Sequence, residues 1–240
     1  MKNFNNNIIL FGIIAIITSA CKKAEVITTP VATVNIINDI VNGGSVKTNF
    51  ASHTDKVNYF SGITPIAYGS NAVYGTLAGI DNPLNVAPTD TTQSLLKTTI
   101  NLPGGTLYSL YLAGQTSAVD NLLIQDNVPA RTDSTAGIRF INLSYNSTPI
   151  AINITGSANG SEVSSLAYKS ITDFKSYNND YKHTAYTFEF RNASTGVLLT
   201  SYAMSGTALP RFKNVTLVIK GVSGVTSGTT ALGIQLVKNY

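Results

Sequence analysis

The sequence predicts an all-β protein: two tandem immunoglobulin-like antiparallel β-sandwich domains that follow a lipoprotein signal peptide. Three observations lead to this fold class. Short segments alternate apolar and polar residues with the period of two that a strand requires. Turns rich in Gly and Asn separate these segments. Five sequence blocks also occur twice in the same order, about 100 to 110 residues apart, as tandem domains would require.

The N-terminus is typical of an exported protein. Lys2 precedes an apolar run over 8–17, and small residues at 18–20 lead directly to Cys21. A run this short cannot span a hydrocarbon core, which needs about 20 residues, so residues 1–20 are expected to be a cleaved signal peptide. The arrangement resembles the lipobox of bacterial lipoproteins, which implies that Cys21 is lipidated. The alternative is an ordinary secretory signal with a cysteine nearby.

The residues after Cys21 indicate where such a lipoprotein is held. Lys22 and Lys23 stand where an Asp would favour retention in the inner membrane, so a lipid anchor in the outer membrane is expected. Whether the protein faces the periplasm or the cell surface stays open. Residues 21–30 have no periodicity and are expected to be a tether between the lipid and the fold.

Composition excludes several classes of function. Only 12% of the 240 residues are charged, against about 25% in an average soluble domain. The formal net charge of +4 comes without a basic stripe, so nucleic acid is not an expected partner. Cys21 is the only cysteine, and its lipidation would leave no thiol for a disulfide, a metal or a nucleophile.

Strand patterns recur through the rest of the chain. Residues 150–154 alternate strictly, with three isoleucines on one face, and residues 186–191 place three aromatic side chains inward and Thr187, Glu189 and Arg191 outward. Residues 215–220 alternate in the same way. Turn residues separate these runs, for example at 42–44, 103–105 and 159–161. Many short strands of this kind indicate β-sandwiches.

The internal repeat sets the number of domains. Each block of the first half has a counterpart in the second: 34–38 with 138–142, 46–50 with 150–154, 66–70 with 166–170, 107–114 with 214–221, and 122–125 with 232–235. The repeat predicts one sandwich over 31–127 and another over 134–240. The polar, proline-containing segment 128–133 is the expected linker.

Several of these residues suggest a family. Residues 139–144 (Arg-Phe-Ile-Asn-Leu-Ser), followed by Pro149 and an alternating strand, resemble the opening of the bacterial family called domain of unknown function 4397. Residues 68–70 resemble its middle motif, and 106–114 resemble its Tyr-rich strand; Lys169 replaces the middle glycine in the second copy. The resemblance implies two tandem domains in a Bacteroidetes-type envelope lipoprotein. It implies a fold and no activity.

Chemistry-bearing motifs are scarce. His53 and His183 lie far apart, without ligand spacing or a serine elbow near either. The twelve acidic residues mostly occupy turns or strand exteriors, although distant carboxylates can converge in a fold as glycoside hydrolysis requires. We therefore predict no catalytic residues, no metal and no cofactor.

One polar loop is the candidate ligand contact: Tyr177, Asn178, Asn179, Asp180 and Tyr181. A tyrosine ring can stack on a sugar while amides and a carboxylate bind its hydroxyl groups. The alternative is that the two tyrosines cap the open end of the sandwich. The loop has only one carboxylate, which is too few for the oxygen ligands that a calcium site needs. Because the loop is suited to contact a ligand, a glycan or an envelope protein is the expected partner.

Two Asp-Ser/Thr sequences resemble acceptors of Bacteroidetes-type O-glycosylation, which makes Thr91 and Ser134 candidate modification sites. Taken together, the sequence predicts a non-enzymatic binding or structural module of the outer membrane or cell surface. The alternative is a glycan-active hydrolase or an accessory carbohydrate-binding protein of the envelope. A structural subunit would expose an apolar patch rather than a polar loop.

Overall fold

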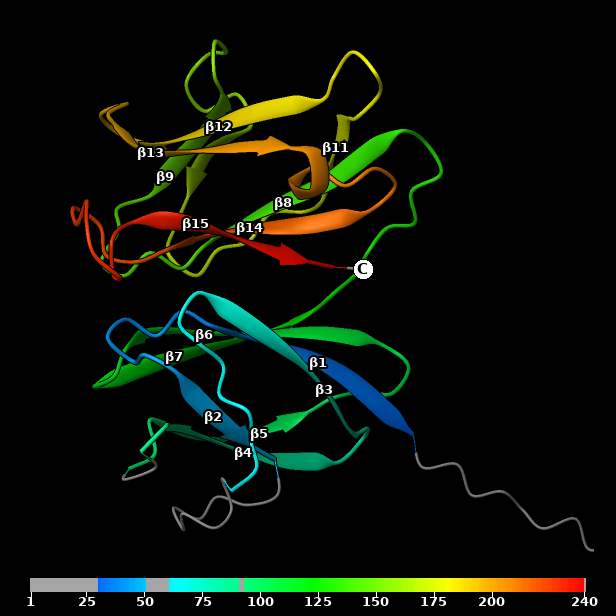
Figure 1. The fold of residues 1–240 in the computed structure, drawn as a ribbon, viewed down its shortest axis with the longest axis vertical. Helices are drawn as coiled ribbons and strands as arrows, with labels where there is room; N and C mark the ends of the chain where they lie inside the picture. The colour runs from blue at the N-terminus through cyan, green and yellow to red at the C-terminus, as the bar shows by residue number, and fades with distance from the viewer. Residues whose placement is uncertain (1–29, 51–60, 91–92, 240) are drawn as a thin grey trace, which may run out of the picture.

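The computed structural model describes residues 30–50, 61–90 and 93–239. These residues form fifteen strands and one 3₁₀ turn, η2 (Gly206–Ala208), arranged as two sandwiches one above the other (Figure 1). The all-β sandwich class is therefore confirmed. Within the described ranges, no helix is both long enough and apolar enough to span a bilayer.

The N-terminal sandwich consists of a four-stranded sheet, in the order β3-β1-β6-β7, and a three-stranded sheet, β2-β4-β5. Its strands are β1 (Val31–Asn38), β2 (Val46–Asn49), β3 (Ser70–Leu77), β4 (Asp81–Pro88), β5 (Leu96–Asn101), β6 (Leu107–Gln115) and β7 (Ala118–Gln125).

The C-terminal sandwich repeats this arrangement with the sheets β11-β8-β14-β15 and β10-β9-β12-β13. Its strands are β8 (Thr135–Asn142), β9 (Ile150–Ile154), β10 (Val163–Leu166), β11 (Lys175–Asn178), β12 (Ala185–Asn192), β13 (Leu198–Ser205), β14 (Asn214–Lys220) and β15 (Gly233–Lys238). The sheets β3-β1-β6-β7 and β11-β8-β14-β15 each contain one parallel pair, β1 with β6 and β8 with β14, which the alternation patterns do not predict. The second sheet has three strands in the N-terminal sandwich and four in the C-terminal one.

Local details also recur in the two sandwiches. The Asn38 side chain donates to the carbonyl of Ile66, and the Asn142 side chain donates to the carbonyl of Leu166, at 2.9 and 3.0 Å. Gly69 has a positive φ of 72°, and Lys169 at the corresponding place has φ 63°. A backbone position that needs a left-handed conformation favours glycine, so Lys169 occupies a place where glycine would be unstrained.

One of the five repeated blocks is displaced from the sequence alignment. In the strand ladders, Tyr111 lies opposite Leu122, and its counterpart Val218 lies opposite Gln235. Leu122 therefore corresponds to Gln235 and not to Leu232. The hairpin loop after β14 is longer than the loop after β6, and this difference in length shifts the last strand by three residues.

Each sandwich has its own apolar core. Val34, Ile36, Leu84 and Leu110 are among the fully buried residues of the N-terminal core. In the C-terminal core, the ring of Phe140 meets those of Phe188 and Phe190 edge-on, with centroids 5.3 and 6.3 Å apart. The inward orientation that the alternation predicts for the 150–154 and 186–191 strands is confirmed, because Ile150, Ile152, Phe188 and Phe190 belong to this core.

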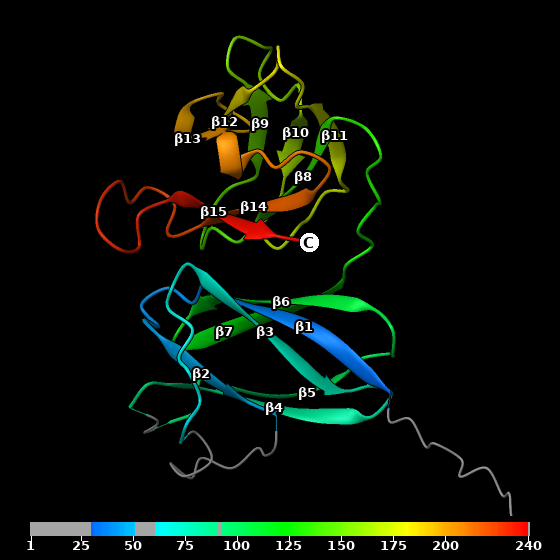
Figure 2. The same ribbon diagram turned by 45° about the vertical axis from the view of Figure 1, so that its right-hand side comes forward.

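A third apolar cluster joins the two sandwiches. The sheet β3-β1-β6-β7 of the N-terminal sandwich and the sheet β11-β8-β14-β15 of the C-terminal sandwich face one another across the junction (Figures 1 and 2). Between them lie buried side chains from both sheets: Ile37, Tyr111, Ala113, Ile141, Leu143, Val218 and Val237. Strands β8 and β14 are consequently buried on both faces, and every residue of β8 is buried. Strands buried on both faces carry almost continuous apolar runs rather than a clean alternation.

A buried ion pair crosses this junction. The Arg139 guanidinium of β8 contacts the Asp126 carboxylate, which follows β7, and the two side chains are 5% and 4% exposed. Asp126 also accepts a hydrogen bond from the Ser109 hydroxyl at 2.6 Å. Arg139 donates to the Thr216 hydroxyl at 2.8 Å and to Tyr111 at 3.5 Å. The pair therefore has partners from both sandwiches.

Three further contacts across the junction involve the repeated blocks 68–70 and 168–170. Tyr168 and Lys169 donate to the Asp120 carboxylate of β7 at 2.9 and 2.8 Å. On the other side, the Lys220 ammonium of β14 lies 4.3 Å from the centre of the Tyr68 ring. Equivalent loops of the two sandwiches thus each contact the opposite sandwich, as in an isologous interface.

Asp39, beside Lys220, should make stability depend on pH. It is fully buried, and within the described residues its carboxylate oxygens accept no hydrogen bond. Burial raises the pKa of Asp39 to about 7, although nearby Lys220 lowers it in part. Between the unfolded and folded pKa values the native state binds the extra proton, so stability is greatest at low pH and falls as pH rises.

We expect the free energy of unfolding to fall by up to about 1.4 kcal/mol per pH unit from this group between pH 5 and 7. Urea unfolding of the wild type and of Asp39→Asn, each at pH 5 and at pH 7, measures this change in unfolding free energy. The wild type should lose stability relative to the variant as pH rises; an unchanged difference would contradict the burial of a titrating carboxyl.

Candidate binding site

The polar loop predicted as a ligand contact connects β11 to β12, but its first residue belongs to the core. Tyr177 is 5% exposed, and its ring packs edge-on against Tyr186 and Phe188. Its hydroxyl donates to the Glu162 carboxylate at 2.6 Å. Burial, and then this carboxylate, raise the pKa of Tyr177. Tyr177 therefore packs inside the end of the sandwich and does not present its ring to a ligand.

Asn179 has a positioning role. It is buried, and its side-chain amide donates to the carbonyl of Leu209 at 2.5 Å. Its own carbonyl accepts from Arg211 Nε at 2.6 Å, and its backbone N–H donates to Ser134 at 2.7 Å. These bonds fix the loop after β11 to the segment that follows η2.

Asp180 closes the turn that presents the next residues. Its Oδ1 atom accepts from the backbone N–H groups of Lys182 and His183 and lies 2.9 Å from the His183 ring nitrogen. These bonds, that of His183 first, hold the pKa of Asp180 below its usual value. The turn leaves Tyr181 82% exposed. Asn178 is also exposed, while its carbonyl accepts from the Tyr186 hydroxyl at 2.8 Å.

A hollow of about 430 Å³ lies between this loop and the segment around η2. It is lined by Asn179, Thr184, Gly206, Leu209, Pro210, Arg211 and Phe212. We call it the end hollow.

Phe212 is the unusual residue of the end hollow. It has φ 63°, a left-handed conformation that is strained for a bulky residue, and it is 49% exposed. Its backbone N–H donates to Thr135 at 2.8 Å, which holds the strained position. Strain of this kind clusters at functional sites. Sequence reasoning missed Phe212 and Arg211; the only signal was an aromatic and a cation beside Pro210 in a turn.

A second hollow, of about 280 Å³, lies at the junction beside Arg139. The aromatic ring in its wall, Phe174, is covered by the Arg139 guanidinium, 4.5 Å from the ring centre. That ring face is therefore not free to stack on a ligand, and the end hollow is the better candidate.

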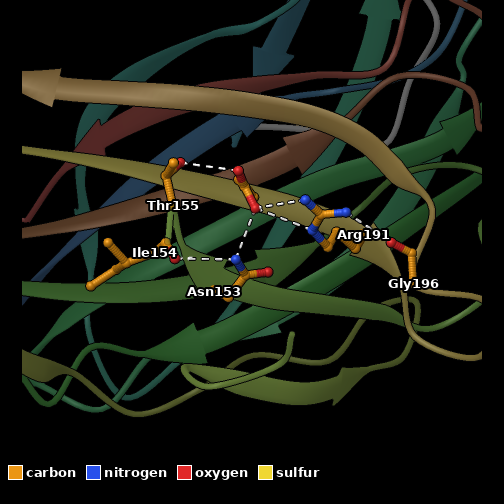
Figure 3. A network of polar contacts seen from close by, with 6 residues as sticks. Asn153, Ile154, Thr155, Arg191 and Gly196 are labelled. Carbon is orange, nitrogen blue, oxygen red and sulfur yellow. Dashed lines mark hydrogen bonds and ion pairs between the residues drawn. The ribbon is translucent and has the colours of Figure 1, made fainter. Parts of the chain in front are cut away.

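A polar network on β9 and β12 involves the acid Glu189 (Figure 3). Its carboxylate accepts from the Asn153 amide at 2.9 Å, from Thr155 at 3.1 Å and from Arg191 at 2.8 and 3.1 Å. The bonds from Arg191 and then Asn153 keep the pKa of Glu189 low. A carboxylate held ionised in this way is a structural group and not a general acid at neutral pH.

The remaining candidate residues are placed as follows. Within the described ranges, no three His, Cys, Asp or Glu side chains gather as a metal site would require. Ser134 is exposed, just before β8. Cys21, Thr91 and His53 lie outside the described residues. Lipidation at Cys21 and glycosylation at Thr91 and Ser134 stay predictions.

Comparison with known proteins gives a family and weak structural likenesses. The family described as "Domain of unknown function (DUF4397)" matches residues 31–153, which span the N-terminal sandwich and continue through β8 into β9. No curated protein matches the chain.

Among solved structures, a family 26 carbohydrate-binding module of Eubacterium rectale Amy13K with maltoheptaose is 15% identical, covering 88% of this chain and 97% of that one, with a TM-score of 0.26. Family 41 modules of streptococcal virulence factors, which recognise α-glucan, are 9% identical over 79% and 93% of the two chains, with a TM-score of 0.25. Likeness at this level does not bear on the ligand of this chain.

The two tyrosines of the loop should respond differently to truncation. Tyr177→Ala removes a buried ring and should cost about 3 to 5 kcal/mol of unfolding free energy, as for other large buried aromatics. Tyr181→Ala removes an exposed ring and should change stability by less than about 0.5 kcal/mol. Urea unfolding of both variants is the check, and equal costs would contradict the placement of the loop.

Proposed function

The chain belongs to the DUF4397 family, and we propose that it is a non-enzymatic envelope lipoprotein whose C-terminal sandwich binds a glycan at the end hollow. One observation carries this proposal. Two exposed aromatic side chains, Tyr181 and Phe212, lie on loops that Asn179 and Arg211 tie together around a hollow of about 430 Å³.

The residues of the end hollow suit a flat, hydroxyl-rich ligand. The Phe212 ring offers an apolar face, while Arg211 and Thr184 offer hydrogen-bond donors in the same lining. Tyr181, two residues after Asn179 on the same loop, is exposed, with the Lys182 ammonium 5.5 Å from its ring centre. Binding residues are commonly carried by loops on a stable scaffold, and the C-terminal sandwich is such a scaffold.

The absence of catalytic groups near the end hollow favours binding over hydrolysis. Asp180, next to Asn179 in the chain, caps a turn, and Glu162 accepts from Tyr177 and Lys175. A hydrolase of glycosides needs two carboxyl groups facing one bond. Among the residues that the structure describes, no acidic side chain lines the hollow.

The proposal includes two tandem copies of the family domain, divided by a linker over 128–133, as in the Bacteroidetes-type lipoproteins that the sequence resembles. The shared strand order and the matching contacts of Asn38 and Asn142 support the duplication. It also includes a lipid anchor on Cys21 in the outer membrane. Whether the protein faces the periplasm or the cell surface stays open. Palmitate labelling that is equal in the wild type and in Cys21→Ala would remove the anchor from the proposal.

Glycan-array binding of the chain from residue 21, with Cys21→Ser, tests the ligand. Phe212→Ala and Tyr181→Ala should each weaken binding about tenfold, since stacking contacts are worth about 1 kcal/mol or more. Leu198→Ala is the control, because Leu198 is 48% exposed, like Phe212, but lies on β13 outside the end hollow.

The expected result is weaker binding in the two aromatic variants, with unchanged unfolding for Tyr181→Ala and unchanged binding in the control. Binding that survives both aromatic substitutions would move the site elsewhere. A chain that binds no glycan, or one that cleaves a glycan on the array, would overturn the proposed function.

A further inference from the structure

The outward face of β3-β1-β6 carries exposed apolar side chains at the end that lies beyond the junction residues Ile37 and Tyr111. Val31 and Val73 are each 63% exposed, and Leu77 and Leu107 are 46% and 47% exposed. Val31 lies directly opposite Leu77 in the β1–β3 ladder. Strand residues two apart, and residues directly opposite, share a face, so these side chains lie on one face of β3-β1-β6. The other face, with Ala32 and Val34, is packed in the core.

A hollow of about 220 Å³ lies on this face. Its walls include Thr33, Val73 and Leu107 of the N-terminal sandwich, together with Val128 and Lys238. A side chain added at Gly75, which lies opposite Thr33, would meet no atom within 4 Å. The space above Thr33 and Gly75 is therefore open.

In the C-terminal sandwich the equivalent face is covered by the chain segment that leads into it. Arg131 Nε donates to the Asn214 side chain at 2.7 Å, and Arg131 Nη1 donates to the Ser176 hydroxyl at 2.5 Å. Asn214 in turn donates to the carbonyl of Pro129 at 2.9 Å. The segment lies so close that a side chain at Gly137 would collide with the Arg131 guanidinium.

Strand register establishes the equivalence of the two faces. Gly137 lies beside Ser176 and Asn214 in the C-terminal sandwich. Thr33 lies beside Gly75 and Leu107 in the N-terminal sandwich. In the N-terminal sandwich, the position equivalent to that of Arg131 therefore lies above Thr33, Gly75 and Leu107. This position is the open hollow.

The sequence before each sandwich matches its face in polarity. Arg131 precedes Gly137 by six residues, and the residue six positions before Thr33 is Ile27. The C-terminal face offers an amide and a hydroxyl to the Arg131 guanidinium, whereas the N-terminal face offers Leu107 and Val73. Apolar side chains are favoured where apolar surface would otherwise meet water.

We propose that residues 24–29, which lie outside the described residues, cover this face as 128–133 cover its equivalent, with Ile27 against Leu107. The undescribed N-terminal residues end at Thr29, and Pro30 leads directly into Val31 on this face, so the segment is within reach. Burial of Ile27 on Leu107 would supply the cover that Leu107 lacks. This inference does not depend on the proposed glycan site.

The proposal changes what the expected tether does. If Cys21 carries the lipid, only residues 22 and 23 would remain free between the anchor and the fold. The N-terminal sandwich would then lie close to the membrane, and the end hollow of the C-terminal sandwich would lie beyond the junction.

Disulfide trapping tests the contact, because the chain has one cysteine and Cys21→Ser removes it. In the chain from residue 21, Ile27→Cys with Leu107→Cys should form an intramolecular disulfide at least tenfold faster than Ile27→Cys with Ile80→Cys. Ile80 matches Leu107 in exposure, at 48% and 47%, and lies in the turn after β3, near the start of β1, where the Ala78 N–H donates to the carbonyl of Pro30. A disulfide needs Cα atoms within about 7 Å, so a segment docked on Leu107 favours the first pair, whereas an undocked segment reaches both positions.

Equal rates for the two pairs would overturn the proposal. Disulfide-linked dimers of Leu107→Cys, without intramolecular product, would assign the face to a second copy and would also overturn it. As a second measurement, Ile27→Asp should lower the melting temperature by about 2 to 4 °C, the shift for about 1 kcal/mol in a chain of this size. Thr28→Asp is the matched control, and an equal shift in both variants would count against Ile27 as the buried residue.

Discussion

The buried pair of Arg139 and Asp126 is the interaction on which the arrangement of the two sandwiches depends. Both charges are buried, and each is compensated by the other. The Ser109 hydroxyl also donates to Asp126, and the Thr216 hydroxyl accepts from Arg139. Removing one partner would leave an uncompensated charge in the interior. The two facing sheets are consequently held in one relative position. The apolar side chains around the pair, such as Tyr111 and Val218, form a continuous junction.

This junction also explains what could be predicted from the sequence and what could not. The alternation in 186–191 correctly places Phe188 and Phe190 inward, because one face of that sheet meets solvent. In β8 and β14 both faces are buried, so alternation does not reveal that Ile141 and Val218 contact the other sandwich. The near-continuous apolar runs were the available signal, but a run alone does not name its partner.

The candidate site shows the same limit at the level of single residues. The density of Tyr, Asn and Asp in 177–181 correctly marks a loop at the end of a strand, but polarity does not tell which side chain points inward. Tyr177 lies opposite Ala136 in the ladder and points to the core, whereas Tyr181 is four residues further, past the Asp180 turn. Phe212 reaches the site through a left-handed conformation, which no sequence pattern here indicates.

The most direct test of the central role of the ion pair is a double-mutant cycle followed by urea unfolding of the chain from residue 21. Asp126→Leu and Arg139→Met alone should each lower the unfolding free energy by about 3 to 5 kcal/mol, because each leaves one buried charge unpaired. The double variant should recover most of that loss, since two apolar side chains replace the pair. Costs that simply add in the double variant would contradict the account, because they would show that the two charges do not stabilise one another.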